Sequence, residues 1–343
     1  MKKMEVKMKG KLRLLSVLLA TVIVAVSLPL AGCSGGEKEL NMYVAYGNPE
    51  IVAQEFEKAT GIKVNFLPMS SGEVLTRLKA EKANPQTDIW FGGGSDAFLD
   101  ATNEGLLHAY KAPNATNVDP VFKDADGYWT AVSIVVVGLV ASDTRLNNKG
   151  LELPKTWADL TAAGFYNEIS SPDPNISGTA YTAISGILQI LGEEQGWQFL
   201  DSLFANIEFL EKSGSAPPSK ALQGEYCIGI APDPHITAID NPGAPVSVVF
   251  PEDGVLAWPS PVAIVNGAKN LENAKTFVNW TLSDEGQKVL MQASPRVPVT
   301  NVETIAGVPT LADLNMAGYD YLYWGAERSR ILAEFNTRYP QYQ

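Results

Sequence analysis

Residues 40–110 repeat one pattern three times: a short apolar stretch, a polar or glycine-rich corner, and a segment with apolar positions at helical spacing. The apolar stretches cover residues 40–45, 63–67 and 88–91. After the second of them, Val74, Leu75 and Leu78 recur at the spacing that gives a helix one buried face. Strands that alternate with helices in this way predict an α/β fold with a mostly parallel sheet.

Each corner lies at the carboxyl end of a predicted strand and at the start of a predicted helix. In open α/β sheets ligands bind at this edge, where the free N–H groups of helix starts favour anions. The corner at residues 92–95 lacks the lysine and the spacing of a nucleotide-binding loop, so it does not predict nucleotide hydrolysis. It is either a turn where a ligand can approach the backbone closely or a tight strand-to-helix turn. The corner residues predicted to contact a ligand are Tyr46, Asn48, Ser70, Ser71, Gly94 and Ser95.

Two longer apolar segments, residues 132–141 and 255–265, have the composition of strands that are buried on both faces. We interpret them as crossovers between two lobes, each a mostly parallel sheet flanked by helices, with a ligand cleft between the lobes. The expected division is a signal segment at 1–32, a spacer at 33–39, lobe 1 at 40–138, lobe 2 at 139–256, a return to lobe 1 at 257–303, and closing helices at 304–343 that the pattern assigns to neither lobe.

The N-terminus resembles a bacterial lipoprotein signal. Six basic residues precede an apolar run from 14 to 30, and small residues lead to Cys33, which a polar spacer follows. We therefore predict export, cleavage before Cys33 and acylation of Cys33, which would hold the body at a membrane surface facing the periplasm or the cell exterior. An uncleaved membrane helix is the alternative.

Composition narrows the choice of partners. Residues 1–32 carry six basic and one acidic side chain, so their removal leaves 311 residues with 20 basic and 37 acidic side chains, a net charge near −17. Nucleic acid is therefore excluded as a partner. With Cys33 acylated, Cys227 has no disulfide partner, and we expect it in a buried strand. We expect a monomer that needs no cofactor and no metal.

A second group of candidate residues comes from lobe 2. In Ser177-Gly178-Thr179-Ala180-Tyr181, Ser177 is placed to cap a helix over residues 179–191, and the next residues leave N–H groups free for a phosphate or carboxylate. Simple capping by Ser177 is the alternative. Asp233 and His235 follow a predicted strand and are placed to reach the cleft, and Glu252 is either a turn residue or a carboxylate that faces the ligand. Motifs of hydrolases are absent from the sequence.

Several segments together resemble the solute-binding proteins of ABC importers. They include residues 70–81, Asp88-Ile89-Trp90-Phe91-Gly92-Gly93, Glu104-Gly105-Leu106-Leu107, residues 177–181, Gly224-Glu225-Tyr226 and residues 274–287. The resemblance is to the group that binds ferric iron, thiamine, polyamines, phosphorylated sugars and aminoethylphosphonate. It implies the two-lobed type II fold of periplasmic binding proteins, a small-molecule solute, a membrane permease as partner, and no catalysis.

The resemblance also suggests which ligand the cleft takes. Iron-binding members carry a tyrosine pair where this chain has Pro232-Asp233-Pro234-His235. The helix start at Ser177 resembles members that bind organophosphates or phosphonates. By this comparison Ser70, Ser71, Gly94, Ser95, Ser177, Gly178 and Thr179 hold an anion, and Asp233, His235 and Glu252 select the rest of the solute. Tyr46, Asn48 and Tyr181 are further predicted ligand contacts. A ferric-iron or organic-cation binder is the first alternative, and an exported hydrolase is a remote one.

Overall fold

The computed structural model describes residues 38–343. The signal segment and Cys33 lie outside the described residues. Among the described residues, no helix is both long enough and apolar enough to cross a membrane.

Lobe 1 contains the three predicted repeats. Strands β1 (Glu39–Val44), β2 (Lys63–Pro68) and β3 (Ile89–Phe91) are parallel, with β1 in the middle. Each strand is followed by a helix: α2 (Pro49–Thr60), α3 (Ser71–Glu81) and α4 (Ser95–Asn103). Tyr43 and Trp90 face one apolar core, whereas Met42, Val44 and Phe91 face another on the opposite side of the sheet. The strands and helices predicted for residues 40–110 are therefore confirmed.

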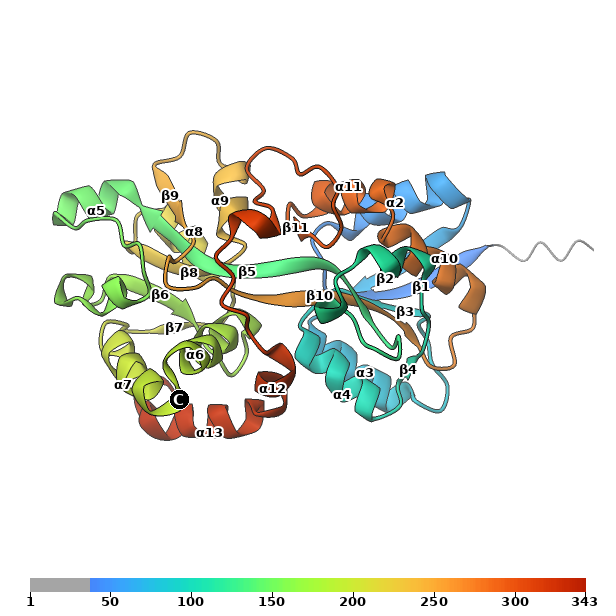
Figure 1. The fold of residues 1–343 in the computed structure, drawn as a ribbon, viewed down its shortest axis with the longest axis horizontal. Helices are drawn as coiled ribbons and strands as arrows, with labels where there is room; N and C mark the ends of the chain where they lie inside the picture. The colour runs from blue at the N-terminus through green and yellow to red at the C-terminus, as the bar shows by residue number, and fades with distance from the viewer. Residues whose placement is uncertain (1–37) are drawn as a thin grey trace, which may run out of the picture. The chain divides into compact units, whose positions relative to one another are not determined.

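Two long strands cross the centre of the sheet as an antiparallel pair (Figure 1). They are β5 (Thr130–Ser142) and β10 (Leu256–Val265), and every residue of both is buried. The register of the pair shifts between Ser260 and Pro261. Both crossover strands were predicted from their continuous apolar runs, and both are confirmed. They join the strands of the two lobes into one sheet with the order β2-β1-β3-β10-β5-β8-β6-β7.

Lobe 2 is built on three further parallel strands beyond β5. These are β8 (Ile228–Pro232), β6 (Ile169–Pro172) and β7 (Leu210–Glu211), and β9 (Val246–Val249) pairs with the end of β5. Its helices are α5 (Asp143–Lys149), α6 (Gly178–Leu191), α7 (Glu193–Phe204), α8 (Ala216–Leu222) and α9 (Pro234–Asp240). Helix α6 covers the range predicted from the capping position of Ser177.

The chain returns to lobe 1 after β10. Helices α10 (Leu271–Thr281) and α11 (Asp284–Ala293) pack on the face that also carries α2. Two short strands complete the sheet: β4 (Leu107–His108) pairs with β10, and β11 (Val297–Pro298) pairs with β5.

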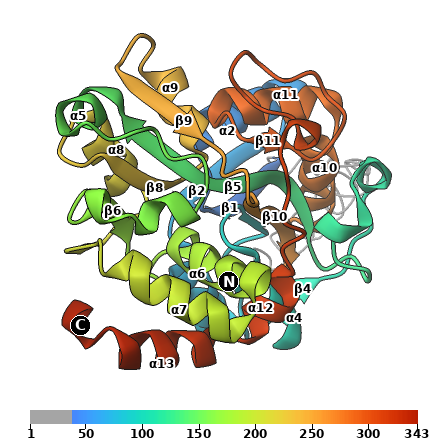
Figure 2. The same ribbon diagram turned by 60° about the vertical axis from the view of Figure 1, so that its left-hand side comes forward.

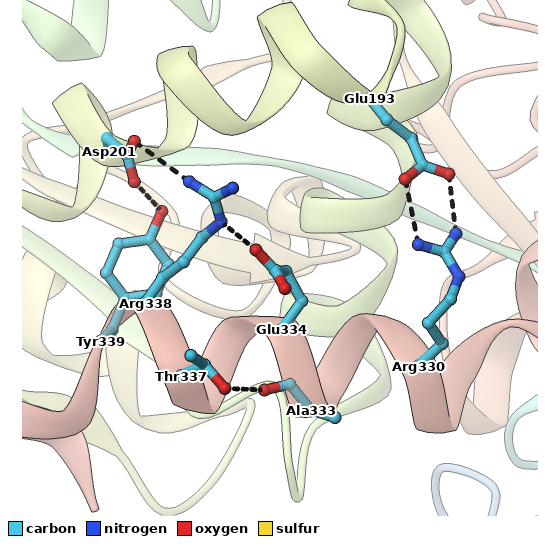
Figure 3. Close-up of polar contacts among 8 residues, drawn as sticks. All are labelled: Glu193, Asp201, Arg330, Ala333, Glu334, Thr337, Arg338 and Tyr339. Atoms are coloured by element: carbon cyan, nitrogen blue, oxygen red, sulfur yellow. Dashed lines mark hydrogen bonds and ion pairs between the residues drawn. The ribbon is translucent and has the colours of Figure 1, made fainter.

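The C-terminal segment contacts both lobes. Helix α13 (Arg328–Arg338) lies along α7 of lobe 2 (Figure 2), where the ring of Phe204 is 4.7 Å from Tyr339 and 5.1 Å from Phe335. Two ion pairs reinforce this contact: Arg330 with Glu193, and Arg338 with Asp201 (Figure 3). The shorter helix α12 (Tyr321–Ala326) packs on α4 of lobe 1. The pattern of residues 304–343 assigned this segment to neither lobe, and in the structure it bridges them.

A buried carboxylate fixes the arrangement of lobe 2. Glu168, just before β6, accepts hydrogen bonds from three side chains: Arg145 (2.9 Å from Nη2 to Oε1), Lys149 (2.6 Å) and the Cys227 thiol (3.3 Å). Burial alone would raise the pKa of Glu168, but these donors outweigh it and lower the pKa to about 2. Cys227 is buried, as predicted, and burial next to this carboxylate raises its pKa to about 12. A thiol in that environment stays protonated.

We expect Glu168→Gln to lower the free energy of unfolding at neutral pH by roughly 3 kcal/mol, because a carboxyl pKa lowered on folding stabilises the ionised native state. The contribution is present above the unfolded pKa and is lost as pH falls, so the difference between wild type and variant should shrink from about pH 5 to about pH 2. Urea unfolding of the full chain in detergent at several pH values measures it. Glu193→Gln, at an exposed ion pair, is the control. A difference that does not change with pH would contradict this account.

Candidate functional site

Helix starts from both lobes line one cavity, which we call the interlobe cavity. Gly94, Ser95 and Asp96 come from the start of α4, and Gly178, Tyr181 and Thr182 come from the first turns of α6. Trp258 of β10 and four C-terminal residues complete the lining: Tyr319, Tyr321, Gly325 and Arg328. The cavity has about 30 Å³ of free volume. This volume is smaller than the roughly 300–1,000 Å³ of pockets that hold small-molecule ligands in proteins.

On the lobe 1 side, glycines allow the backbone to turn tightly after β3. Gly92 has φ +78° and lies against the backbone of Ala45, and a Cβ there would come within 2.8 Å of the Ala45 carbonyl oxygen. Gly94 donates its N–H to the Ser71 hydroxyl at 2.9 Å, which ties the second and third corners together. Ser70 is exposed and forms a capping box with Glu73. Ser71, Gly94 and Ser95 are therefore brought together, whereas Ser70 is engaged by its own helix.

On the lobe 2 side, Ser177 is the N-cap of α6 and accepts a hydrogen bond from the Ala180 N–H at 3.5 Å. Gly178 is exposed, and Thr179 is buried next to Gly214. The ring of Tyr181 lies beneath the guanidinium group of Arg328, whose Cζ is 4.5 Å from the ring centroid. The predicted residues of this helix start therefore lie at or beside the cavity.

The three tyrosines of the cavity remain neutral phenols. Burial raises the pKa of Tyr181, Tyr319 and Tyr321 well above the usual value. Each hydroxyl also has a protein partner: Tyr181 donates to the Trp324 carbonyl, Tyr321 donates to the Val121 carbonyl, and Tyr319 lies 2.7 Å from the Ser185 hydroxyl. These phenols are therefore poor candidates for phenolate ligands of a metal ion.

A second polar group lies where the two lobes meet, and we call it the Arg296 cluster. Arg296 follows α11 in lobe 1, and its Nε donates to the Asp233 carboxylate of lobe 2 at 3.1 Å. Its guanidinium Cζ is 4.9 Å from the ring centroid of Tyr46. His235 reaches lobe 1 as well, because its Nε2 is 2.7 Å from the Pro295 carbonyl oxygen.

The Arg296 cluster is buried but only partly satisfied. Burial raises the pKa of Asp233 although Arg296 opposes the shift, and burial lowers the pKa of His235. Within residues 38–343, neither His235 Nδ1 nor the Ser133 hydroxyl has a hydrogen-bond partner. Asp233 also has φ +45°, which is strained for a residue with a side chain. Strain, a charged pair and unsatisfied polar atoms in one place are typical of a functional site.

The cavity and the cluster are neighbours on the central strands. Trp258 lines the cavity, and the Ser260 hydroxyl is 3.5 Å from Arg296 Nη1. Residues two apart in a strand point to the same face and lie about 7 Å from each other. The two groups are therefore adjacent parts of one candidate site.

Two predicted residues lie elsewhere. Glu252 is exposed in the turn before β10, where its N–H donates to the Lys155 carbonyl and its carbonyl accepts from Asn315. Asn48 is exposed at the start of α2, and its side chain makes no capping bond.

Sequence reasoning missed Arg296, Arg328, Tyr319 and Tyr321. The signal that was available for Arg296 is its position directly after a predicted apolar helix, in Ser294-Pro295-Arg296-Val297-Pro298. The C-terminal residues gave no comparable signal, because their segment was not assigned to a lobe.

Residues 84–324 match the family model described as bacterial extracellular solute-binding protein. The chain belongs to this family. An uncharacterised protein of Haemophilus influenzae is 31% identical to this solute-binding protein over 330 residues, which cover 93% of this chain and 95% of the other. A Salmonella typhimurium protein named as a putative 2-aminoethylphosphonate-binding periplasmic protein is 26% identical over 71% of this chain and 72% of its own.

A solved structure is similarly related to this solute-binding protein. It is the periplasmic binding protein AfuA from Actinobacillus pleuropneumoniae with exogenous fructose 6-phosphate bound, at 33% identity and a TM-score of 0.79. The match covers 88% of this chain and 98% of that chain. The type II fold that the sequence predicted is therefore confirmed, and the protein is a solute-binding component of an ABC importer that acts outside the cytoplasm.

We expect Arg296→Met to destabilise the solute-binding protein by about 3 kcal/mol at neutral pH, because it leaves a buried carboxylate without its cation. Without Arg296 the folded-state pKa of Asp233 lies further above its unfolded value, so the lost stability should return as pH falls and Asp233 takes up a proton. Denaturant titration of the full chain at several pH values measures both effects.

The control for this prediction is Arg330→Met, which breaks an exposed ion pair and should change stability by less than about 1 kcal/mol. The double variant Asp233→Asn with Arg296→Met should recover most of the loss, since no buried charge remains unpaired. If the double variant is as unstable as Arg296→Met, the ion pair is not the cause.

Proposed function

We propose that this solute-binding protein captures a small organophosphate or phosphonate between its lobes and delivers it to a membrane permease. In this proposal the two central strands bend, lobe 1 (residues 40–138 and 257–303) and lobe 2 (residues 139–256) close over the solute, and the protein catalyses no reaction. It acts as a monomer, without a cofactor, held at the membrane by acylated Cys33.

The observation that carries this proposal is the meeting of two helix starts, from opposite lobes, at one cavity. The α4 start offers Ser95 and carries Asp96 in its first turn, and the α6 start offers Gly178 and has no acidic residue in its first turn. Free N–H groups at helix starts bind oxyanions and carry the positive end of the helix dipole. A phosphorus oxyanion that reaches both starts bridges the lobes, and so it favours the closed form.

The remainder of the solute is assigned to the Arg296 cluster next to the cavity. Asp233 and His235 there combine a carboxylate with a neutral imidazole that has an unused nitrogen. Such groups hydrogen-bond hydroxyl or amine groups. Support for the phosphorylated class comes from the fructose 6-phosphate named for AfuA and from the phosphonate named for the Salmonella relative.

Ferric iron is supported less well. In the described part of the chain, no three His, Cys, Asp or Glu side chains gather into a group able to hold a metal ion. The tyrosines that line the cavity have raised pKa values and occupied hydroxyls. A hard trivalent ion needs several anionic oxygens that converge on one point.

Calorimetric titration of the full chain in detergent tests the ligand class. The panel is fructose 6-phosphate, 2-aminoethylphosphonate, ferric citrate, thiamine and a polyamine. We expect binding of at least one phosphorylated or phosphonate solute, with a Kd of roughly 1 μM or below, and no turnover of it. Binding of ferric citrate or of an organic cation alone would replace this proposal with one of its alternatives.

We expect Cys33→Ser to abolish acylation and to release the protein from the membrane fraction after export, because acyl chains and not a spanning helix hold it there. Fractionation of cells that express each form, with a mass measurement of the mature protein, checks this. A Cys227→Ser variant, which leaves the predicted acylation site intact, is the control. Retention of Cys33→Ser in the membrane at wild-type levels would favour an uncleaved membrane helix.

A further inference from the structure

We propose that Arg328, at the start of α13, is the residue that pairs with the phosphorus oxyanion of the solute. This inference rests on the proposed function. It adds a contact between the anion of the solute and the C-terminal segment to the contacts made by the two helix starts. Arg328 supplies the one basic side chain among the described residues that line the interlobe cavity, and Asp96 supplies the one acidic side chain.

The guanidinium group of Arg328 is held in place but keeps donors free. Its Nη2 donates to the Pro174 carbonyl oxygen at 3.2 Å, and the Tyr181 ring supports it from one face. Its Nη1 is shielded from solvent and has no hydrogen-bond partner in the part of the chain that the structure describes. A guanidinium group carries five N–H donors in a planar fork. A buried donor without an acceptor is costly, and an oxyanion in the cavity would satisfy it.

The contact between Arg328 and Asp96 is weak enough to be exchanged. The Nε of Arg328 is 3.8 Å from the nearer Asp96 oxygen, which is longer than a hydrogen bond. A phosphoryl or phosphonyl group offers three acceptor oxygens, which match the guanidinium fork better than one distant carboxylate does. Asp96 then becomes available to a hydroxyl or amine of the same solute.

The position of Arg328 couples anion binding to lobe closure. Helix α13 is held on α7 of lobe 2 by the packing of Phe335 and Tyr339 on Phe204, and Arg328 itself bonds the Pro174 carbonyl of lobe 2. Asp96 belongs to the first turn of α4 in lobe 1. The guanidinium group of Arg328 therefore rests on lobe 2, and an anion that bonds both Arg328 and the α4 start is held by groups from both lobes.

The test is affinity for fructose 6-phosphate and 2-aminoethylphosphonate, measured by calorimetry on the full chain. We expect Arg328→Gln to weaken binding of the probe that wild type takes by roughly 10- to 100-fold, the usual effect of losing hydrogen bonds to a charged group. The affinity of Arg328→Lys should lie between those of wild type and Arg328→Gln, because lysine keeps the charge and loses the planar fork. Arg330→Gln, two residues along the same helix, is the matched control and should bind within about 2-fold of wild type.

The outcomes separate this inference from the proposed function. If wild type binds neither probe, the proposed function fails and this inference fails with it. If wild type binds and Arg328→Gln binds equally well, or if Arg328→Gln and Arg330→Gln weaken binding equally, only the role of Arg328 is overturned. Thermal unfolding without ligand checks that each variant is folded, and Arg328→Lys decides the question should Arg328→Gln not fold.

Discussion

The central strands β5 and β10 must remain buried on both faces while they connect the lobes. Neither strand contains a charged residue, because a charge on either face would lie in an apolar core without a partner. Their antiparallel pairing satisfies the backbone hydrogen bonds along the crossing. Charged groups can therefore reach the junction of the lobes only from strand ends and helix starts. This constraint explains why the candidate chemistry gathers after β3, β6 and β8 and after α11.

The two buried carboxylates Glu168 and Asp233 differ in how many hydrogen-bond donors surround them. Glu168 has three donors, its pKa is lowered, and its partners join α5 to the strands of lobe 2. Asp233 has one cation and one backbone donor, its pKa is raised, and its backbone is strained. A fully satisfied carboxylate stabilises a fold, whereas a partly satisfied one between two lobes is available for exchange with a ligand. The contrast favours Asp233, and not Glu168, as part of the binding site.

The sequence predicted the fold well because the fold is carried by local periodicity and by continuous apolar runs. The strands before Tyr46 and Gly92, both crossover strands and the start of α6 were all confirmed. Arg328 was missed for the opposite reason, since it meets Asp96 only through the packing of α12 on α4, which joins segments far apart in the sequence. Turn residues are equally ambiguous in sequence. Ser70 has a hydroxyl group that could contact a ligand, but this hydroxyl donates a hydrogen bond to Glu73 in the helix that Ser70 caps.

A protein with a net negative charge can bind an anionic solute because the repulsion from its net charge and the attraction from nearby donors act over different distances. The net charge of −12 for the full chain acts over distances at which physiological salt already screens it, since the Debye length is about 8 Å. The cavity is lined by a guanidinium group, two helix starts and one carboxylate, and the guanidinium Nε of Arg328 is 3.8 Å from the carboxylate of Asp96. Short-range interactions strengthen as water leaves. In the proposed function, closure of the lobes would therefore strengthen the contacts to an anion at distances over which the long-range repulsion is screened.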